Sequence, residues 1–299
     1  MFEGINHFGL RLLAALIEQK GFEDISVSPP AIYLPLAMLR GAASGATRAG
    51  LSRLLGSSES LTDEERERKI RALRSILTLE HTTFEVSVKT RGQRPFSPTF
   101  LRRAQESYGA QLYPDDSNLP LRLLSQLNAS LNLDGTVAQV EADPLVGFRL
   151  PSVGGRRSLS LLVPRKARFW QGKNRPLQDL FERLNDDFFA SWQGQLMKAA
   201  PEKRPAMLLL PALPLIVEAE DLLPHLKELD MGPAITPSAD FSLMMVSGEA
   251  PHIATLRHTL QVPLSGFETG PDLCPLFWWI TDEPSELIVA LGVRWSSTG

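Results

Sequence analysis

The stretch "HTLQVPLSGFETGPDLCPLFWWI", residues 258–280, contains two strand-like runs separated by a segment rich in proline and glycine. The first run is the end of "IATLRHTLQV", which has β-branched residues, and the second is "PLFWWIT", which has aromatic and β-branched residues. Strands favour both kinds of residue. The segment between them, Pro263 to Cys274, spans at most about 40 Å when fully extended. Its prolines lack the backbone donors of a regular strand. The stretch therefore predicts two sheet strands joined by a short connection.

Composition sets wide limits on the class of protein. The 299 residues are 43% hydrophobic, which suffices for one large domain or two ordinary ones. The net charge of -3 gives no reason to expect nucleic acid, an anionic membrane or an acidic polymer as a partner. The N-terminal run "MFEGINHFGLRLLAALIEQKG" is amphipathic, unlike a secretory signal, and no run reaches the roughly 18 apolar residues of a membrane span. Cys274 is the single cysteine, which excludes an intrachain disulfide and favours a cytoplasmic location.

Helical patterns fill the first part of the chain. Residues 4–19 place apolar side chains on one face, and "PPAIYLPLAMLRG" predicts a short buried helix after them. In "SESLTDEERERKIRALRSIL", Thr62 and Glu65 have the spacing of a capping box. A solvated helix is therefore expected to begin after Thr62.

From about residue 84 helices and strands are mixed. "FEVSVKTRG" alternates as a half-buried strand does, "SPTFLRRAQESYGAQLY" predicts a helix followed by a strand, and "PLRLLSQLNASLNLDG" predicts a further helix. "LVGFRLP" and "RSLSLLVP" predict a hairpin around Gly154 and Gly155, and residues 176–197 suit one or two helices. Strand candidates dominate the last third. The predicted class is α+β with largely antiparallel sheets.

Sequence motifs for catalysis and metal binding are absent. None of the five histidines lies three or four residues from another or from Cys274, so no metal-ligand spacing exists. There is no GxGxxG, P-loop or G-x-S-x-G motif, so no cofactor and no catalytic residue are predicted. His258 lies in an apolar and hydroxyl-bearing strand and is predicted to be buried and hydrogen-bonded.

Six collinear blocks resemble the serpin family. "SVSPPAIYLPLAMLRGAASGAT" is similar to the family's Ser-Pro-x-Ser-Ile, Leu-Ala-Met-Leu and Gly-Ala-x-Gly-x-Thr pattern, with Ala31 replacing the second serine. The other blocks are "FLRRAQESYGAQLYPDD", "FRLPSVGGRRSLSLLVP", "MLLLPALPLIVEAEDLLPHLKELDMGPAITPSADFSLM", "LRHTLQV" and "PLFWWITDEPSELIVALGVRW". The resemblance implies one serpin-like domain over residues 1–299, with N-terminal helices packed on largely antiparallel sheets. It also makes His258 a structural residue of the family's shutter region.

The chain departs from the family pattern at two places. In an inhibitory serpin, the strand that carries this histidine leads into an acidic hinge and a long exposed loop, which a protease cleaves and which then inserts into the main sheet. The segment from Pro263 to Cys274 is too short for that loop, and no Glu-Glu-Gly-Thr hinge is present. A second deletion is expected before "LVGFRLP", where the family has a central strand of the main sheet. The resemblance thus implies a non-inhibitory protein whose main sheet closes directly.

Small-molecule binding is the function that we favour from the sequence. Some serpins hold apolar molecules between the first helix, a later helix and the second sheet, and the corresponding helical walls here are residues 4–19 and 186–196. The predicted ligand contacts are Trp192, Phe277, Trp278, Trp279, Arg294 and Trp295. Arg294 would suit an anionic or carbonyl-bearing ligand.

Three alternatives stay open. An enzyme could reuse the cavity for shape-controlled chemistry, such as the cyclisation of a flexible apolar substrate. A protein-interaction module would use exposed apolar surface to bind a protein partner. Inhibition by a short rigid loop would present Phe267 to a chymotrypsin-like site.

In "FWW" at 277–279, alternation places Trp278 on the opposite face from its neighbours, and packing in a sheet core is the competing role for all three residues.

Overall fold

A computed structural model describes most of the chain. The described residues are 2–21, 23–56, 61–79, 82–91, 96–115, 121–142, 144–164, 186–203, 213, 215–229, 231–246, 251–268 and 276–295. Cys274 and the predicted helical residues 176–185 lie outside them. Among the described helices, none is both long and apolar enough to cross a membrane.

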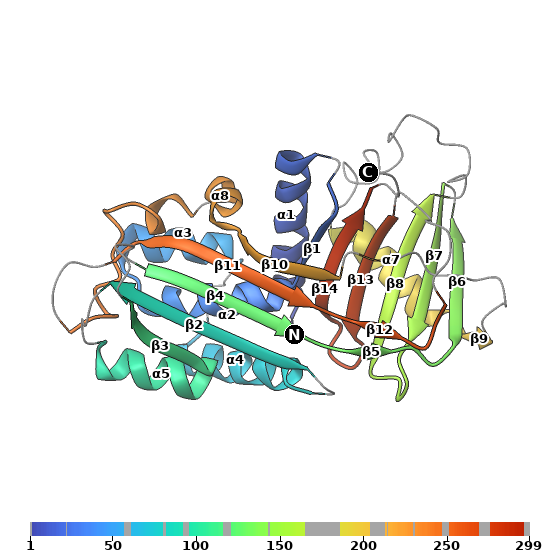
Figure 1. Cartoon of the computed structure of the whole chain (residues 1–299), viewed down its shortest axis with the longest axis horizontal. Coiled ribbons are helices and arrows are strands. Elements are labelled where there is room, and N and C mark those ends of the chain that lie inside the picture. Colours follow the sequence, from blue (N-terminus) through green and yellow to red (C-terminus); the bar gives the residue numbers. More distant parts are fainter. Residues whose placement is uncertain are drawn as a thin grey trace. The chain divides into compact units, whose positions relative to one another are not determined.

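The chain forms two compact units that alternate along the sequence (Figure 1). Unit 1 comprises residues 1–28, 130–216 and 262–299, and unit 2 comprises residues 29–129 and 217–261. Each unit contains one main sheet.

Unit 1 is built on a sheet in the order β1-β14-β13-β8-β7-β6-β9, in which every adjacent pair is antiparallel. Its strands are β1 (Ile25–Val27), β6 (Thr136–Ala142), β7 (Leu145–Pro151), β8 (Arg157–Pro164), β9 (Glu202–Lys203), β13 (Leu276–Asp282) and β14 (Leu287–Arg294). Helix α1 (Glu3–Lys20) contacts β14, and helix α7 (Asp186–Lys198) contacts β6 and β7. Strands β8 and β13 are buried along their whole length, so both faces of the sheet's centre are covered.

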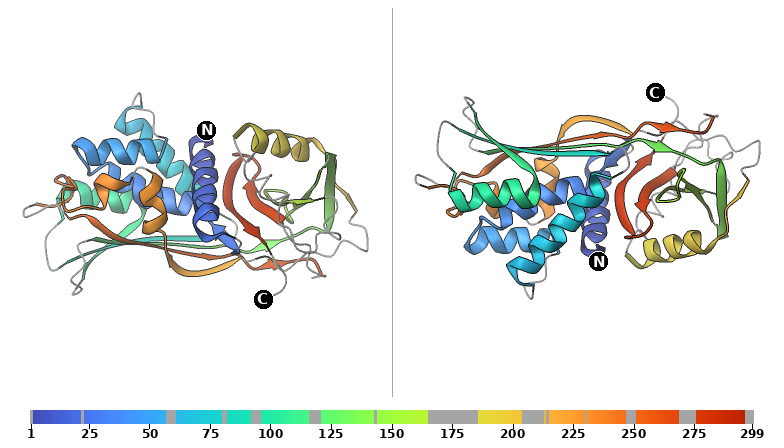
Figure 2. Two further views of the ribbon diagram at one scale, coloured as in Figure 1. Left: turned by 90° about the horizontal axis from the view of Figure 1, so that it is seen from above. Right: turned by 90° about the horizontal axis from the view of Figure 1, so that it is seen from below.

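Unit 2 is built on a sheet in the order β10-β11-β4-β2-β3. Its strands are β2 (Thr83–Arg91), β3 (Ala110–Asp115), β4 (Leu121–Asn128), β10 (Ile216–Asp221) and β11 (Ile253–Gln261). Its helices are α2 (Pro29–Arg40), α3 (Gly45–Leu54), α4 (Asp63–Leu77), α5 (Pro98–Tyr108) and α8 (Leu223–Leu226), with short 3₁₀ turns at Lys227–Leu229 and Gly232–Ala234. These helices lie on one side of the sheet (Figure 2).

Local signals predicted several of these elements correctly. The Thr62 hydroxyl accepts a hydrogen bond from the Glu65 backbone N–H at 3.2 Å, and the Thr62 N–H donates to the Glu65 carboxylate at 2.8 Å. Helix α4 therefore begins with the predicted capping box. The hairpin of β7 and β8 also forms, with Gly154 and Gly155 at positive φ in its turn.

The helix predicted from "PLRLLSQLNASLNLDG" is wrong, because these residues form β4 and the short strand β5 (Leu131–Asn132). Burial alternates strictly along β4, with Leu121, Leu123, Ser125 and Leu127 buried and the residues between them half-buried. Strand β4 pairs in parallel with β11 and antiparallel with β2. The expected deletion of a central strand rested on that helix. The structure instead places β4 in the central position, and the sheet is closed directly by the β11–β4 pair.

The chain that follows β11 is held in a second ladder rather than released as a loop. Strand β12 (Leu264–Ser265) pairs in parallel with β5, and the Leu131 and Leu133 N–H groups donate to the carbonyls of Pro263 at 3.1 Å and Ser265 at 2.9 Å. This ladder fixes the first part of the connection that the sequence predicted, up to Ser265. Residues 269–275 of the connection lie outside the described part of the chain.

Candidate functional site

A cavity of about 470 Å³ lies in unit 1 between helices α1 and α7. It is lined by Phe2, Glu3, Asn6, His7 and Leu10 of the first helix and its cap, by Asp186, Phe189, Ala190, Gln193, Gly194, Met197 and Lys198 of α7, and by Ser285 and Glu286. Two of the walls that the sequence predicted, residues 4–19 and 186–196, therefore do face a common space.

The apolar part of the wall comes from inward-facing positions of the two helices. Phe2, Leu10 and Phe189 are each at most 5% exposed, and Met197 is half-buried beside them. On α7, Ala190 and Gly194 line the cavity one turn apart. A Cβ built on Gly194 would meet no heavy atom within 4 Å, so the missing side chain leaves open space. Small residues on α7 thus keep the cavity wide.

The polar part of the wall is mainly acidic. Three acidic residues line the cavity, Glu3, Asp186 and Glu286, together with Lys198 and His7. The His7 Nδ1 is hydrogen-bonded to the Asp186 carboxylate, and both side chains are about half exposed. This contact joins the second turn of α1 to the first residue of α7.

Asn6 fixes the position of α1 against the turn between β13 and β14. Its side-chain nitrogen donates to the Glu286 carbonyl at 2.8 Å, and its side-chain oxygen accepts from the Ile288 N–H at 2.9 Å. Glu286 has a φ of 57°, a left-handed conformation that is uncommon for residues other than glycine. The two hydrogen bonds hold this turn, and with it Glu286, at the edge of the cavity.

The six side chains that the sequence proposed as ligand contacts do not line this cavity. Phe277, Trp278 and Trp279 are fully buried, Trp192 and Trp295 are 5% and 3% exposed, and Arg294 is half-buried. Their ligand contact stays a prediction. One residue links them to the cavity wall, because the Phe189 ring lies 5.2 Å from the Trp279 ring, which stacks on Phe277 at 5.2 Å.

Two of these tryptophans pack against glycines of the sheet. A Cβ on Gly147 would lie 2.8 Å from the Trp192 ring, and one on Gly292 would lie 2.7 Å from the Trp278 ring. Trp278 thus occupies the face of β13 opposite Phe277 and Trp279, as alternation predicted. These contacts are those of a sheet core.

Sequence reasoning missed the polar groups of the cavity. His7 and Asp186 are separated by 179 positions, and neither lies in a recognisable motif. The adjacent pair Asp186–Asp187 reads as an ordinary acidic first turn of a helix, which the positive end of the helix dipole favours. Only the folded chain brings the imidazole and the carboxylate together.

Comparisons with known proteins agree with the fold. Residues 3–130 match the family model described as Serpin (serine protease inhibitor). No curated protein sequence matches the chain. Among solved structures, a tumour suppressing serpin matches with a TM-score of 0.81 at 13% identity, covering 98% of both chains. Native protease nexin-1 with heparin matches with a TM-score of 0.77 at 14% identity over 99% of both chains.

Human glycosylated kallistatin matches with a TM-score of 0.76 at 14% identity, covering 97% of this chain and 96% of that chain. At such low identity the structural likeness establishes the fold, and the family model adds the sequence evidence for the N-terminal part. The chain therefore has the α+β serpin fold, and its residues 3–130 match the serpin family model.

Proposed function

We propose that this protein is a non-inhibitory serpin-like carrier that binds one small, partly apolar molecule in the cavity between α1 and α7. The observation that carries the proposal is the cavity itself, whose volume of about 470 Å³ lies within the range of known ligand sites. Its wall combines apolar side chains with a few polar groups, as ligand pockets do. The single cysteine continues to favour a cytoplasmic setting for this carrier.

The lining favours a ligand that carries a basic or hydrogen-bond-donating group. Glu3, Asp186 and Glu286 supply acceptors at the cavity, whereas Lys198 is the single lysine or arginine among its lining residues. An anionic ligand, which Arg294 suggested, would face three carboxylates. The proposed ligand therefore places an apolar body against Leu10 and Phe189 and an amine or hydroxyl near the carboxylates.

The ladder after β11 supports the absence of inhibition. Loop insertion requires the chain after this strand to be free, but here Pro263 and Ser265 accept hydrogen bonds from Leu131 and Leu133. The place beside β11 is also taken by β4 along eight residue pairs. We expect no covalent complex that survives denaturing electrophoresis when the protein is incubated with chymotrypsin-like or trypsin-like proteases. Such a complex would contradict the non-inhibitory part of the proposal.

Native mass spectrometry of the protein purified from its own host tests the carrier function. We expect a 1:1 complex with a small molecule, which denaturation releases and solvent extraction recovers. An empty chain would overturn the proposal of a tight carrier, and a bound polypeptide would favour the protein-interaction module instead.

Two variants on α7 then test the place of binding. Gly194→Phe projects a ring into the open space and should lower ligand occupancy at least tenfold while the protein stays folded. Gln195→Phe adds the same ring on an exposed position of the same helix that does not line the cavity, and it should bind normally. Equal occupancy in the two variants would place the ligand elsewhere.

An enzyme that reuses the cavity is the second candidate, and the His7–Asp186 pair favours it. A carboxylate that orients an imidazole is the arrangement of a general base. His7→Gln separates the two functions, because a carrier retains the same bound molecule in this variant. An enzyme would instead accumulate unreacted substrate, such as the open-chain precursor of a cyclised product, and this would appear in the solvent extract.

A further inference from the structure

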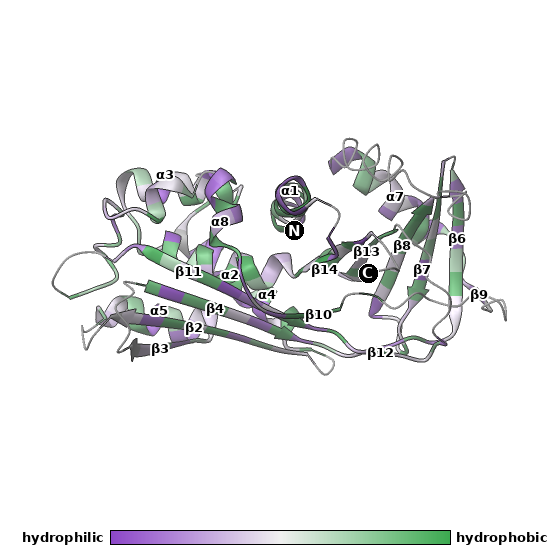
Figure 3. Cartoon of the chain, turned by 45° about the horizontal axis from the view of Figure 1, so that its top comes forward, coloured by the Kyte–Doolittle hydropathy of each residue, from purple (hydrophilic) through white to green (hydrophobic). Residues whose placement is uncertain are grey.

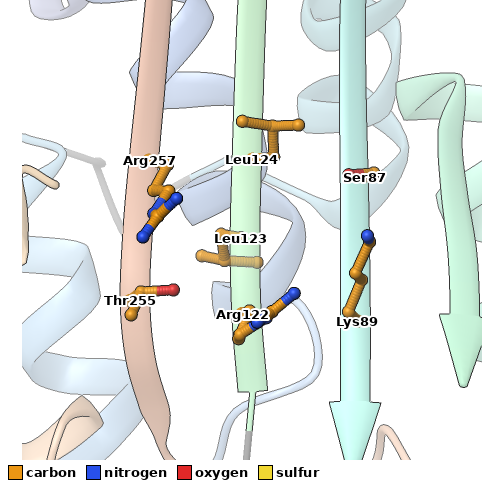
Figure 4. A pocket seen from close by; sticks show the side chains of 7 residues that line it. All are labelled: Ser87, Lys89, Arg122, Leu123, Leu124, Thr255 and Arg257. Atoms are coloured by element: carbon orange, nitrogen blue, oxygen red, sulfur yellow. The ribbon is translucent and has the colours of Figure 1, made fainter. Parts of the chain in front are cut away.

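The helices of unit 2 leave one face of its sheet uncovered (Figure 2). A second pocket, of about 280 Å³, lies on this face (Figure 4). Strands β11, β4 and β2 supply its lining, which consists of Ser87, Lys89, Arg122, Leu123, Leu124, Thr255 and Arg257. It shares no residue with the cavity between α1 and α7.

Strand alternation places three cations on this face. Leu121, Leu123 and Ser125 of β4 are buried, so Arg122 and Leu124 face the other way, and the alternating hydropathy is visible along the strand (Figure 3). The register sets Lys89 of β2 directly opposite Arg122, with Thr255 of β11 on the other side of that arginine. Arg257 stands opposite Leu124, diagonal to Arg122. Figure 4 shows all three basic side chains on the same face.

This arrangement concentrates positive charge in the pocket. Side chains directly opposite on antiparallel strands have Cβ atoms about 5 Å apart, and like charges there destabilise the sheet. None of the lining residues is acidic. Among the described residues, Lys89 and Arg257 make no ion pair.

The described acidic residues near the pocket either lie away from it or make their contacts with other residues. Glu85 of β2 stands opposite Gln126, two pairs beyond the pocket. On β10, the Asp221 carboxylate accepts the N–H groups of Leu223 at 3.1 Å and Leu256 at 3.0 Å, and Glu220 lies 4.0 Å from His225. Glu218 of β10 is exposed and does not line the pocket. A bound anion would therefore supply an opposite charge to Lys89 and Arg257.

We propose that this pocket binds the phosphate group of a small molecule. Arginine guanidinium groups offer paired donors that match the oxygens of phosphate, and Lys89 adds a compact charge. The hydroxyls of Ser87 and Thr255 supply further donors, while Leu124 gives the organic part of the ligand an apolar contact. The pocket is confined to three strands and the chain's net charge is -3, so a long polyanion would meet no extended basic track.

Isothermal titration calorimetry at low ionic strength tests the proposal, with inorganic phosphate, inorganic sulfate, pyrophosphate and glycerol 3-phosphate as probes. We expect saturable 1:1 binding of at least one of these probes. Lys89→Gln and Arg257→Gln should each weaken it about tenfold, because each removes a charge-assisted hydrogen bond. Arg102→Gln is the matched control, since it removes one exposed arginine from α5 in the same unit without touching the pocket, and it should bind as the wild type does.

The probes distinguish the sources of the anion. If glycerol 3-phosphate binds more tightly than inorganic phosphate, the natural ligand of the pocket is an organic phosphate. The reverse order would overturn the proposal that the phosphate belongs to an organic molecule. No saturable binding of any probe, or equal weakening by Arg102→Gln, overturns the site.

Thermal unfolding in buffer without phosphate or sulfate gives an independent readout. Lys89→Gln should unfold at a higher temperature than the wild type at low salt, because it removes one of the three like charges that line the pocket. A lower unfolding temperature for Lys89→Gln, with no probe-induced rise in the wild type, would contradict the charge argument on which the site depends.

Discussion

At the scale of the residue, His258 shows how burial decides chemical role. Its side chain has no solvent exposure, and its Nδ1 lies 3.0 Å from the hydroxyl of Ser125, the residue directly opposite on β4. Burial lowers the pKa of His258 to about 3, and a backbone hydrogen bond with Ser125 raises it by a smaller amount. The imidazole is therefore neutral at physiological pH. The buried, hydrogen-bonded histidine that the sequence predicted is confirmed.

Because His258 is neutral in the folded protein, we expect the free energy of unfolding to fall in mild acid. An unfolded histidine has a pKa near 6.5, so below that pH the unfolded chain binds a proton that the folded chain excludes. The free energy of unfolding should fall by up to about 1.4 kcal/mol per pH unit between pH 6.5 and 3, or about 2 kcal/mol at pH 5. Urea denaturation at pH 7.5 and pH 5 measures this difference.

His258→Asn removes the titrating group but keeps a side chain that can bond to Ser125. Its unfolding free energy should change by about 2 kcal/mol less than that of the wild type between the two pH values. His252→Asn, on a half-buried histidine just before β11, serves as the control and should keep the wild-type dependence. Identical pH dependence in His258→Asn and the wild type would refute the account.

At the scale of the element, the β12–β5 ladder depends on one glycine. Gly266 has a φ of 82°, and a Cβ at this position would lie 2.2 Å from the Leu133 carbonyl oxygen. Only glycine combines that backbone conformation with such a close approach. Phe267 follows it and is half-buried.

Gly266→Ala should therefore destabilise the protein by at least about 2 kcal/mol, because it adds a steric clash to the strain of a positive φ. Gly154→Ala is the matched control, since Gly154 has a φ of 90° but a Cβ there would meet no heavy atom within 4 Å, and it should cost clearly less. Urea denaturation measures both. Chymotrypsin should also cleave after Phe267 faster in Gly266→Ala than in Gly154→Ala, and equal stabilities and cleavage rates would show that the ladder does not depend on Gly266.

The sequence predicted correctly the elements that depend on residues close together in the chain. It did not predict strand β4, whose structure depends on pairing with strands remote in sequence. The capping box of Thr62 and the hairpin glycines act within a few residues, so the sequence reveals them. In β4, Leu123 and Leu127 are spaced as on a helix face, yet they also fit a period of two. Pairing with β11 and β2 decides between the two patterns, and these partners are remote in sequence.

The same reason explains what was predicted of the candidate site. Residues 4–19 and 186–196 were expected as walls, and both helices line the cavity. The polar contact between His7 and Asp186 depends on the packing of these helices and has no local signature. The tryptophans were predicted as ligand contacts because large aromatic side chains often line pockets. Trp278 and Trp192, however, pack against glycines within the sheet.

At the scale of the whole molecule, neither unit is continuous in sequence. The chain passes between them after Ser28, Ala129, Ile216 and Gln261. If one unit unfolded alone, its segments would become long loops within the other unit. Residues 130–216, for example, would have to be closed as a loop between the two parts of unit 2, at an entropic cost. This connectivity supports our proposal that residues 1–299 behave as a single domain.

We therefore expect one cooperative unfolding transition in urea, and the sequence supplies a separate signal for each unit. All five tryptophans, at positions 170, 192, 278, 279 and 295, fall within the sequence ranges of unit 1, and all three tyrosines, at positions 33, 108 and 113, fall within those of unit 2. Tryptophan fluorescence and second-derivative tyrosine absorbance should give the same midpoint and the same dependence on denaturant. Midpoints that differ beyond error would show that the two units unfold as independent domains, because each probe then follows only the unit that contains it.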